Sequence, residues 1–284
     1  MVAGAAVRGR ASSRPPLSSR RAALPVLPRP SRGHTGEVAG RGGDGQALDP
    51  AGAFGGFGAD LVEFYEGLAA DNSRDYWAAH RDTYQQSVQG PLRALAEALS
   101  AEFGDIKVFR PNRDLRFTPD KRPYTEHASM VAKTARGGGL YFQVGPDGLL
   151  LAGGWYQPAP DSLDRWRHAM DDDAVVDGLR STLKALAAVG FTLDEGDPVT
   201  TAPRGWRRDH RHIDLIRRRS LTVSRTDEPG AWWSTPQCLD RVREGWTACR
   251  DWTQWLEDTI GATTRPATGD SVRAPRGRRA ADEW

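Results

Sequence analysis

The chain has 284 residues, of which 38% are hydrophobic and 27% charged, and its mean hydropathy of −0.59 is low for a chain that folds along its whole length. No apolar run approaches the ~18 residues of a membrane-spanning helix, and two cysteines supply neither a disulfide framework nor a four-cysteine zinc site. The length accommodates one large domain or two small ones.

Charge is distributed unevenly along the chain. The formal net charge is +2, but residues 1–52 hold eight Arg against three acidic residues, and residues 265–284 hold five Arg against three. Residues 53–264 are left with 26 basic and 31 acidic residues and are mildly acidic. We therefore expect no specific nucleic-acid binding by this core, because such a footprint must lie on the folded surface.

Both ends have the composition of unfolded chain. Residues 1–52 are rich in Ala, Gly, Pro, Ser and Arg and show no hydrophobic period, and residues 265–284 are similar. Such segments cannot repay the entropy of ordering. We predict two disordered ends around one domain at 53–264. An organelle transit peptide or a start codon assigned too far upstream are alternative interpretations of the Arg-rich start.

Helical periodicity dominates the first part of the core. Leu61, Phe64, Tyr65 and Leu68 predict a helix over 59–70, which Asp71-Asn72-Ser73 ends. A second apolar stripe comprises Trp77, His80, Tyr84 and Val88, and Gly90-Pro91 is expected to end it. Pro91 suits the first turn of a third helix, whose apolar face is Leu92, Leu95, Leu99 and Phe103.

Strand signals follow from Gly104. Ile106 to Phe109 indicate one strand, and the runs 140–144 and 149–151, joined by Gly145-Pro146-Asp147-Gly148, indicate a hairpin. Helices are predicted at 161–170, 173–189, 209–219 and about 235–260, with a strand at 220–225. This order predicts a single α+β domain in which an antiparallel sheet packs against several helices.

The first segment with readable chemistry runs from Arg110 to Tyr124. Residues 104–136 hold eight basic and four acidic residues. Arg113 and Arg116 could flank a phosphate or carboxylate, because a guanidinium presents a two-pronged fork of donors. Asp114 and Asp120 could hold these arginines in place or act as acid or base. A salt-bridge network that braces a turn is the alternative.

The second segment runs from Ala202 to His210 and on to Arg219. Residues 203–225 hold eight Arg and two Asp. If the two basic segments meet in space, they would form an anion site. The alternative is a solvated basic helix face that Asp209 caps.

The residues of the core resemble a known family. The resemblance rests on Phe57, Leu61, Phe64, Leu68, Asn72, Arg74 and Trp77, then on Arg113-Asp114-x-Arg116-Phe117-x-x-Asp120-Lys121-x-Pro123-Tyr124, and further on Tyr141, Gly153-Gly154, Pro203-x-Gly205 and Asp209-His210. Over roughly 54–260 the chain is similar to the domain of unknown function 2461 family, which comprises conserved hypothetical, mostly bacterial proteins. Pro119, Thr125 and Arg219 stand where that family usually shows Lys, which weakens any role for a lysine nucleophile, and Trp206 replaces a usual Phe. The resemblance implies no established activity.

Other chemical signals are weak. The six His are scattered, no H-E-x-x-H or C-x-x-C occurs, and Gly137-Gly138-Gly139 lacks the Lys of a phosphate loop, so we expect neither metal nor cofactor. Gly153-Gly154 is interpreted as a bulge or close packing. Cys238 and Cys249 are predicted to share one helix face ~16 Å apart, as reduced core residues of a cytoplasmic protein.

Two hypotheses of different class follow. In the first, the protein binds an anionic small molecule through Arg113, Arg116, Lys121, Tyr124 and Arg204, with Asp114, Asp120 or His210 as candidates for proton transfer. In the second, it is a non-catalytic structural or protein-interaction module whose Arg and Asp residues form salt bridges. The sequence does not decide between enzyme and binding protein, and it leaves the oligomeric state open.

Overall fold

The computed structural model describes residues 54–113, 115–116, 120–134, 136–196 and 198–261. The segments expected to be disordered, 1–52 and 265–284, lie outside these residues. Within them, the chain forms an α+β fold around one antiparallel sheet, which confirms the predicted fold class.

The sheet has six strands in the order β1-β2-β3-β4-β6-β5. Their bounds are β1 (Ile106–Val108), β2 (Ala128–Lys133), β3 (Gly139–Gly145), β4 (Gly148–Trp155), β5 (Thr192–Leu193) and β6 (Leu221–Asp227). All neighbouring strands are antiparallel. The predicted β3–β4 hairpin is present, and Gly148 in its turn has a φ of 118° that a side chain would disfavour.

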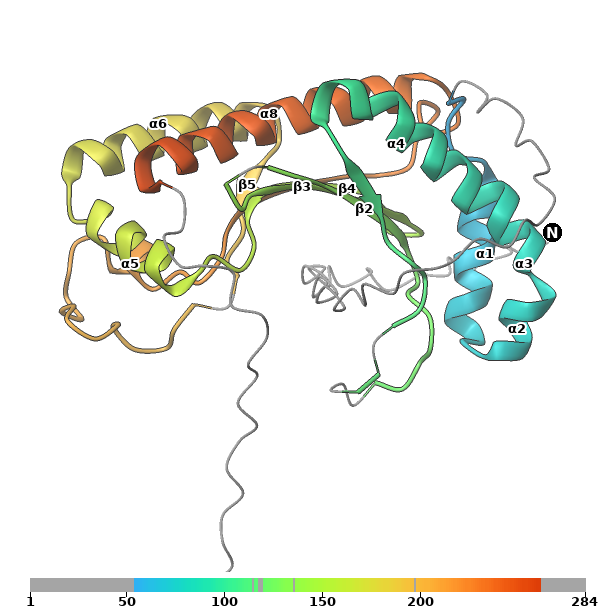
Figure 1. Ribbon diagram of the computed structural model, residues 1–284, viewed down its shortest axis with the longest axis horizontal. Helices are drawn as coiled ribbons and strands as arrows, with labels where there is room; N and C mark the ends of the chain where they lie inside the picture. Colours follow the sequence, from blue (N-terminus) through green and yellow to red (C-terminus); the bar gives the residue numbers. More distant parts are fainter. Residues whose placement is uncertain (1–53, 114, 117–119, 135, 197, 262–284) are drawn as a thin grey trace, which may run out of the picture. The chain divides into compact units, whose positions relative to one another are not determined.

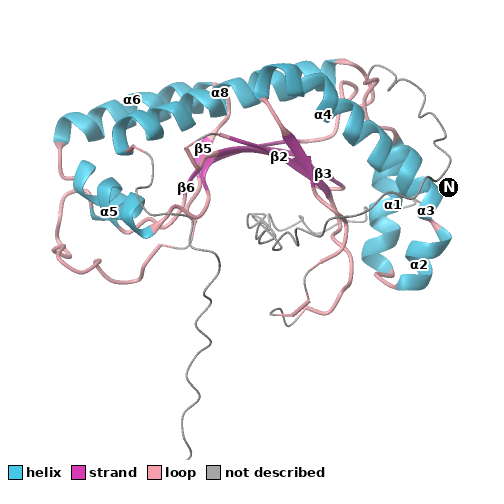
Figure 2. Ribbon diagram, in the orientation of Figure 1, coloured by secondary structure: helices cyan, strands magenta, loops and turns pink. Residues whose placement is uncertain are grey.

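Helices lie before, between and after these strands. Their bounds are α1 (Ala59–Ala70), α2 (Arg74–Ala79), α3 (Arg81–Thr83), a π-helical turn η1 (Tyr84–Gln89), α4 (Gly90–Phe103), α5 (Pro160–Ala169), α6 (Asp173–Ala188), α7 (Ile213–Ile216) and α8 (Gln237–Ile260). Figures 1 and 2 show α4, α6 and α8 together on one face of the sheet. Over the residues described, none of these helices combines the length and the apolar character needed to cross a bilayer.

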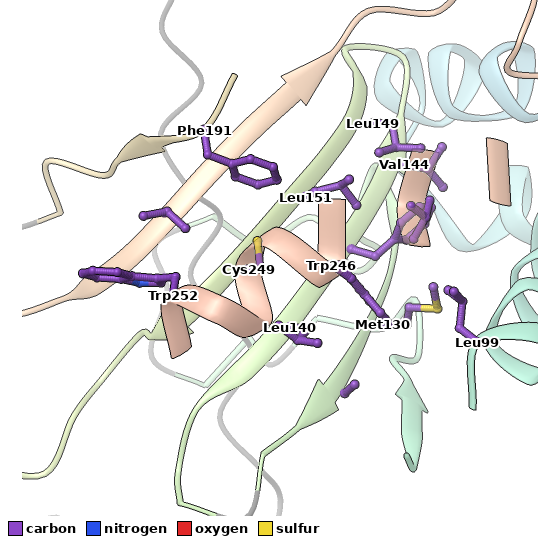
Figure 3. Close-up of a cluster of buried hydrophobic side chains, with 14 of the residues drawn as sticks. Leu99, Met130, Leu140, Val144, Leu149, Leu151, Phe191, Trp246, Cys249 and Trp252 are labelled. Atoms are coloured by element: carbon purple, nitrogen blue, oxygen red, sulfur yellow. The ribbon is translucent and has the colours of Figure 1, made fainter. Parts of the chain in front are cut away.

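The core lies between α8 and the middle of the sheet (Figure 3). Leu149 and Leu151 of β4 alternate toward α8, and the next position on that face is Gly153. A Cβ at Gly153 would lie 2.4 Å from the Cys249 Cβ and 3.0 Å from its Sγ, so the missing side chain lets α8 rest directly on β4. Two indole N–H groups of α8 complete the contact: Trp246 donates to the Tyr141 carbonyl and Trp252 to the Leu221 carbonyl, both at 3.1 Å.

Most predicted elements are present, three predictions need correction, and two strands are not predicted. The stripe at 77–88 is divided into α2, α3 and η1, and Gly90-Pro91 does not end it, because Gly90 keeps helical dihedrals (φ −60°, ψ −58°) and the backbone turns directly into α4. The helix at 209–219 shrinks to α7. The sequence does not predict strands β2 and β5. β2 has five consecutive buried residues and therefore lacks the alternation that marks a strand with one exposed face, and β5 has only two residues.

The contact at Gly153 gives a stability prediction. Gly153→Ala should lower the free energy of unfolding by about 1–3 kcal/mol, because the added methyl forces α8 away from β4. Gly178→Ala is the matched control: Gly178 is an exposed position within α6 where a Cβ would meet no atom within 4 Å, and alanine there should stabilise by roughly 0.5–1 kcal/mol. Urea unfolding measures both; an unchanged midpoint for Gly153→Ala would refute the close contact.

Candidate functional site

The connection between β1 and β2 folds back on itself as a narrow hairpin. Asn112 and Tyr124 form an isolated antiparallel bridge. Beside it, the Arg113 N–H donates to the Pro123 carbonyl at 2.9 Å, and the Thr125 N–H donates to the Pro111 carbonyl at 2.8 Å. Both prolines take part through their carbonyls, so their missing N–H groups do not weaken the pairing. We call the described residues of 113–122 the hairpin tip.

The base of this hairpin is fixed to the helices before it. The Asn72 side-chain amide pairs with the Tyr124 backbone in both directions, donating to the carbonyl at 3.1 Å and accepting from the N–H at 3.0 Å. The Tyr124 ring stacks on Trp77 of α2, with ring centres 4.2 Å apart and an angle of 13° between the planes. Tyr124, a predicted ligand-binding residue, is 8% exposed. Its position suits an anchor of the hairpin.

Asp120 forms ion pairs with two arginines of the hairpin tip. Its carboxylate accepts from Arg113 at 2.6 Å and from Arg122 at 2.7 Å, and Arg122 also pairs with Glu126. Hydrogen bonds from Arg122 and Arg113 hold the pKa of the Asp120 carboxyl well below its usual range. Asp120 is therefore ionised at neutral pH and has no proton to donate, which favours a positioning role.

The other predicted residues of this segment lie at or near the tip. The Lys121 ammonium donates to the Leu115 carbonyl at 3.1 Å, and the Arg116 side chain is exposed and engaged with neighbouring groups. Asp114 lies outside the described residues. Arg113, Arg116, Asp120 and Lys121 are thus carried by one short hairpin.

His127 lies at the end of the hairpin, where the chain enters β2. Its side chain is half-buried, and a Cβ at Gly145, the last residue of β3, would lie 3.3 Å from the His127 Cβ. Burial, aided by the charge of Arg113, lowers the pKa of the imidazole to about 4. His127 is therefore neutral at physiological pH. No sequence pattern singles it out, because its burial depends on the packing of the turn beside it.

The second basic segment lies in the connection between β5 and β6, and ion pairs hold part of it against the junction of α5 and α6. His210 contacts Asp171 at 2.9 Å, and Asp173 receives His212 and Arg211, each at 3.0 Å. His210, a predicted proton-transfer residue, thus joins two segments of the fold. Arg204 is exposed in the same connection.

The two connections leave the sheet at different places. The β1–β2 connection ends at Ala128, which pairs with Val144 beside the β3–β4 turn. The β5–β6 connection ends at Leu221, which pairs with Trp155 at the other end of β4. Arg204 and His210 therefore belong to one connection, and the basic residues of the hairpin tip belong to the other. A cavity shared by the two basic segments remains a prediction.

The sequence does not predict the contacts that several residues make with the hairpin between β1 and β2. Asn72 and Trp77 belong to the motif that carries the family resemblance, but nothing in their spacing indicates that Tyr124, 52 residues after Asn72, is their partner. Sequence reasoning also misses Glu126, although a carboxylate four residues after Arg122 in a basic segment is a usable signal.

Neither cysteine has the character of a nucleophile. Cys238 and Cys249 are buried free thiols, as predicted, and burial raises the pKa of Cys238 to about 12 and that of Cys249 further. Such thiols are unreactive at neutral pH. Among the same residues, no group of three or more His, Cys, Asp or Glu side chains is placed to hold a metal ion.

A family model described as "Conserved hypothetical protein (DUF2461)" matches residues 60–255. The chain belongs to this family, and the resemblance found in its motifs is confirmed. Comparison with curated proteins and comparison with solved structures each give no match.

The neutral state of His127 predicts a pH dependence of stability. An unfolded histidine titrates near pH 6.5, so between pH 6.5 and 4 the unfolded state binds more protons than the folded state. The stability contributed by neutral His127 is complete above pH 6.5 and is lost as pH falls toward 4. Between pH 7 and 4.5, wild type should lose about 2 kcal/mol relative to His127→Gln.

Urea unfolding at a series of pH values measures this difference. The imidazole resonance that disappears in His127→Gln should titrate near pH 4 in the wild-type NMR spectrum. Parallel stability profiles for the two proteins, with that resonance titrating near 6.5, would contradict the prediction.

Proposed function

We propose that the protein binds an anionic small ligand, carrying a phosphate or carboxylate, at the hairpin tip. The observation that carries the proposal is that one ionised carboxylate, Asp120, holds the guanidinium groups of Arg113 and Arg122 side by side. Within 110–127, the described residues comprise five cations (Arg110, Arg113, Arg116, Lys121 and Arg122) and two carboxylates (Asp120 and Glu126). This excess of positive charge favours an anion.

The rigidity of the hairpin base supports binding at its tip. Asn72 and Trp77 fix Tyr124, so the base from which the tip projects is held before any ligand arrives. Less ordering entropy of this base then has to be lost on binding. Arg122 already contacts two carboxylates, whereas the ion pair described for Arg113 involves Asp120 alone. Arg113, with Arg116 and Lys121 on the same tip, is therefore the better ligand contact.

Catalysis is not needed for this proposal. Of the predicted proton-transfer residues, Asp120 fits a positioning role better, while Asp114 and His210 remain candidates. Only turnover of a bound ligand would give either of them that role. Arg204 remains a candidate ligand contact from the β5–β6 connection.

The alternative is a non-catalytic structural or protein-interaction module. The contacts of Asp120 and Glu126 with arginines favour this interpretation, because the same ion pairs would brace the hairpin without any ligand. The two interpretations differ in what happens when an arginine is removed.

Thermal unfolding with a panel of anions tests the proposal. Phosphate, pyrophosphate, citrate and phosphorylated sugars are compared with chloride at matched ionic strength. A ligand at a hundredfold excess over its Kd should stabilise by about 3 kcal/mol, which raises the midpoint of a domain of about 200 residues by roughly 5–10 °C. In Arg113→Ala and Arg116→Ala the part of this shift that binding at the hairpin tip contributes should disappear, while the unliganded midpoint changes by only about 2 °C.

Arg180→Ala serves as the control, because Arg180 is exposed on α6 and its ion pair within the described part of the chain is with Asp177, one turn away. It should keep the full anion-induced shift. If no anion stabilises the wild type, and Arg113→Ala lowers its midpoint instead, the arginines brace the hairpin and the binding proposal is wrong.

A further inference from the structure

A pocket of about 210 Å³ opens in the β5–β6 connection, away from the hairpin tip. It is lined by Thr200, Thr201, Ala202, Arg208, Ile213 and Arg217. Its volume exceeds the ~30 Å³ share of one water molecule in the liquid. It stays below the ~300 Å³ at which pockets for drug-sized ligands begin. The pocket therefore suits a small charged group better than a whole nucleotide.

The fold fixes one of the two lining arginines. The Val199 N–H donates to the Arg217 carbonyl at 3.0 Å, and the Arg217 Nε donates back to the Val199 carbonyl at 2.6 Å. This reciprocal pair ties the start of the connection to the turn after α7. With Nε engaged, the guanidinium of Arg217 is held in place and its two Nη groups are the donors left for a ligand.

The second lining arginine, Arg208, differs from its neighbour Arg207 because Arg207 already has an acidic partner. Arg207 forms a two-pronged contact with Asp209 at 2.9 and 2.7 Å. Arg211 and His212 share Asp173, and His210 takes Asp171. These three acidic groups are thus occupied, and among the described residues neither Arg208 nor Arg217 has an ion pair.

Two cations therefore line a pocket whose described lining contains no acidic side chain. Like charges repel, and two guanidinium groups facing one small volume are stabilised when an anion lies between them. Thr200 and Thr201 also line the pocket, and each carries a hydroxyl that can donate a hydrogen bond. Ile213 and Ala202 add an apolar surface.

We propose that this pocket binds a phosphate group borne by a small organic molecule. Two guanidinium forks and two hydroxyls offer more donors than the two oxygens of a carboxylate can accept, whereas a phosphate monoester presents three terminal oxygens. The carbon part of the ligand would lie along Ile213 and Ala202. The site rests on the β5–β6 connection and does not depend on ligand binding at the hairpin tip.

Calorimetric titration of the full chain with inorganic phosphate and with glycerol phosphate tests the proposal, against acetate at matched ionic strength. The variants are Arg208→Gln and Arg207→Gln, each of which removes one positive charge. The two positions are adjacent, but Arg208 lines the pocket and Arg207 is not among its lining residues. Both side chains are exposed, so both variants should fold as the wild type does. Circular dichroism and the thermal midpoint verify this.

We expect saturable binding of both phosphates, weakened at least about tenfold in Arg208→Gln and less than about twofold in Arg207→Gln. In an Arg113→Ala background, which removes the binding proposed at the hairpin tip, the component of phosphate binding that depends on Arg208 should remain. Equal losses in the two neighbouring variants, binding of acetate as tight as that of phosphate, or loss of the Arg208-dependent component in Arg113→Ala would each overturn the proposal. Absence of phosphate binding at millimolar concentration would overturn it as well.

Discussion

The direct packing of α8 on β4 at Gly153 is the contact on which the rest of the fold depends. With no side chain at this position, Cys249 reaches the strand, and Trp246 and Trp252 come close enough for their indole N–H groups to meet carbonyls of β3 and β6. One helix thereby holds three strands at a fixed distance. The sheet in turn sets where its connections begin, so the placement of both basic segments follows from an apolar contact that carries no charge.

In the hairpin between β1 and β2, some of the residues that identify the family stabilise the fold and do not contribute charged groups to a site. Asn72, Trp77 and Tyr124 all belong to the family resemblance, and all three serve to fix the base of the hairpin. Gly153 belongs to it too, and its role is to admit α8. What remains for chemistry is the charged group of Arg113, Arg116, Asp120 and Lys121, which the anchored base presents on one tip.

Local signals in the sequence predict the elements that have one face in the core. The stripe Leu61, Phe64, Tyr65 and Leu68 predicts α1 with its observed bounds, and Gly145 to Gly148 predict the hairpin turn. β2 escapes prediction because burial of nearly its whole length removes the alternation on which strand prediction relies. For the candidate sites, the sequence identifies two basic segments but not their partners. Pairings such as Asn72 with Tyr124, or Asp173 with His212, span 52 and 39 residues and are created only by the fold.

Charge density alone does not locate a site; the pairing of the charges does. Arg207 and Arg208 are adjacent, equal in charge and both exposed, and no sequence pattern separates them. In the structure Arg207 contacts Asp209, while Arg208 lines a pocket with Arg217 and two threonines. On the hairpin the difference is one of degree, because Arg122 is engaged by two carboxylates and Arg113 by one. An arginine whose charge the fold already balances stabilises the fold. An arginine whose charge the fold leaves unbalanced carries an electrostatic cost that an anionic ligand removes, and this difference selects the residues on which binding should depend.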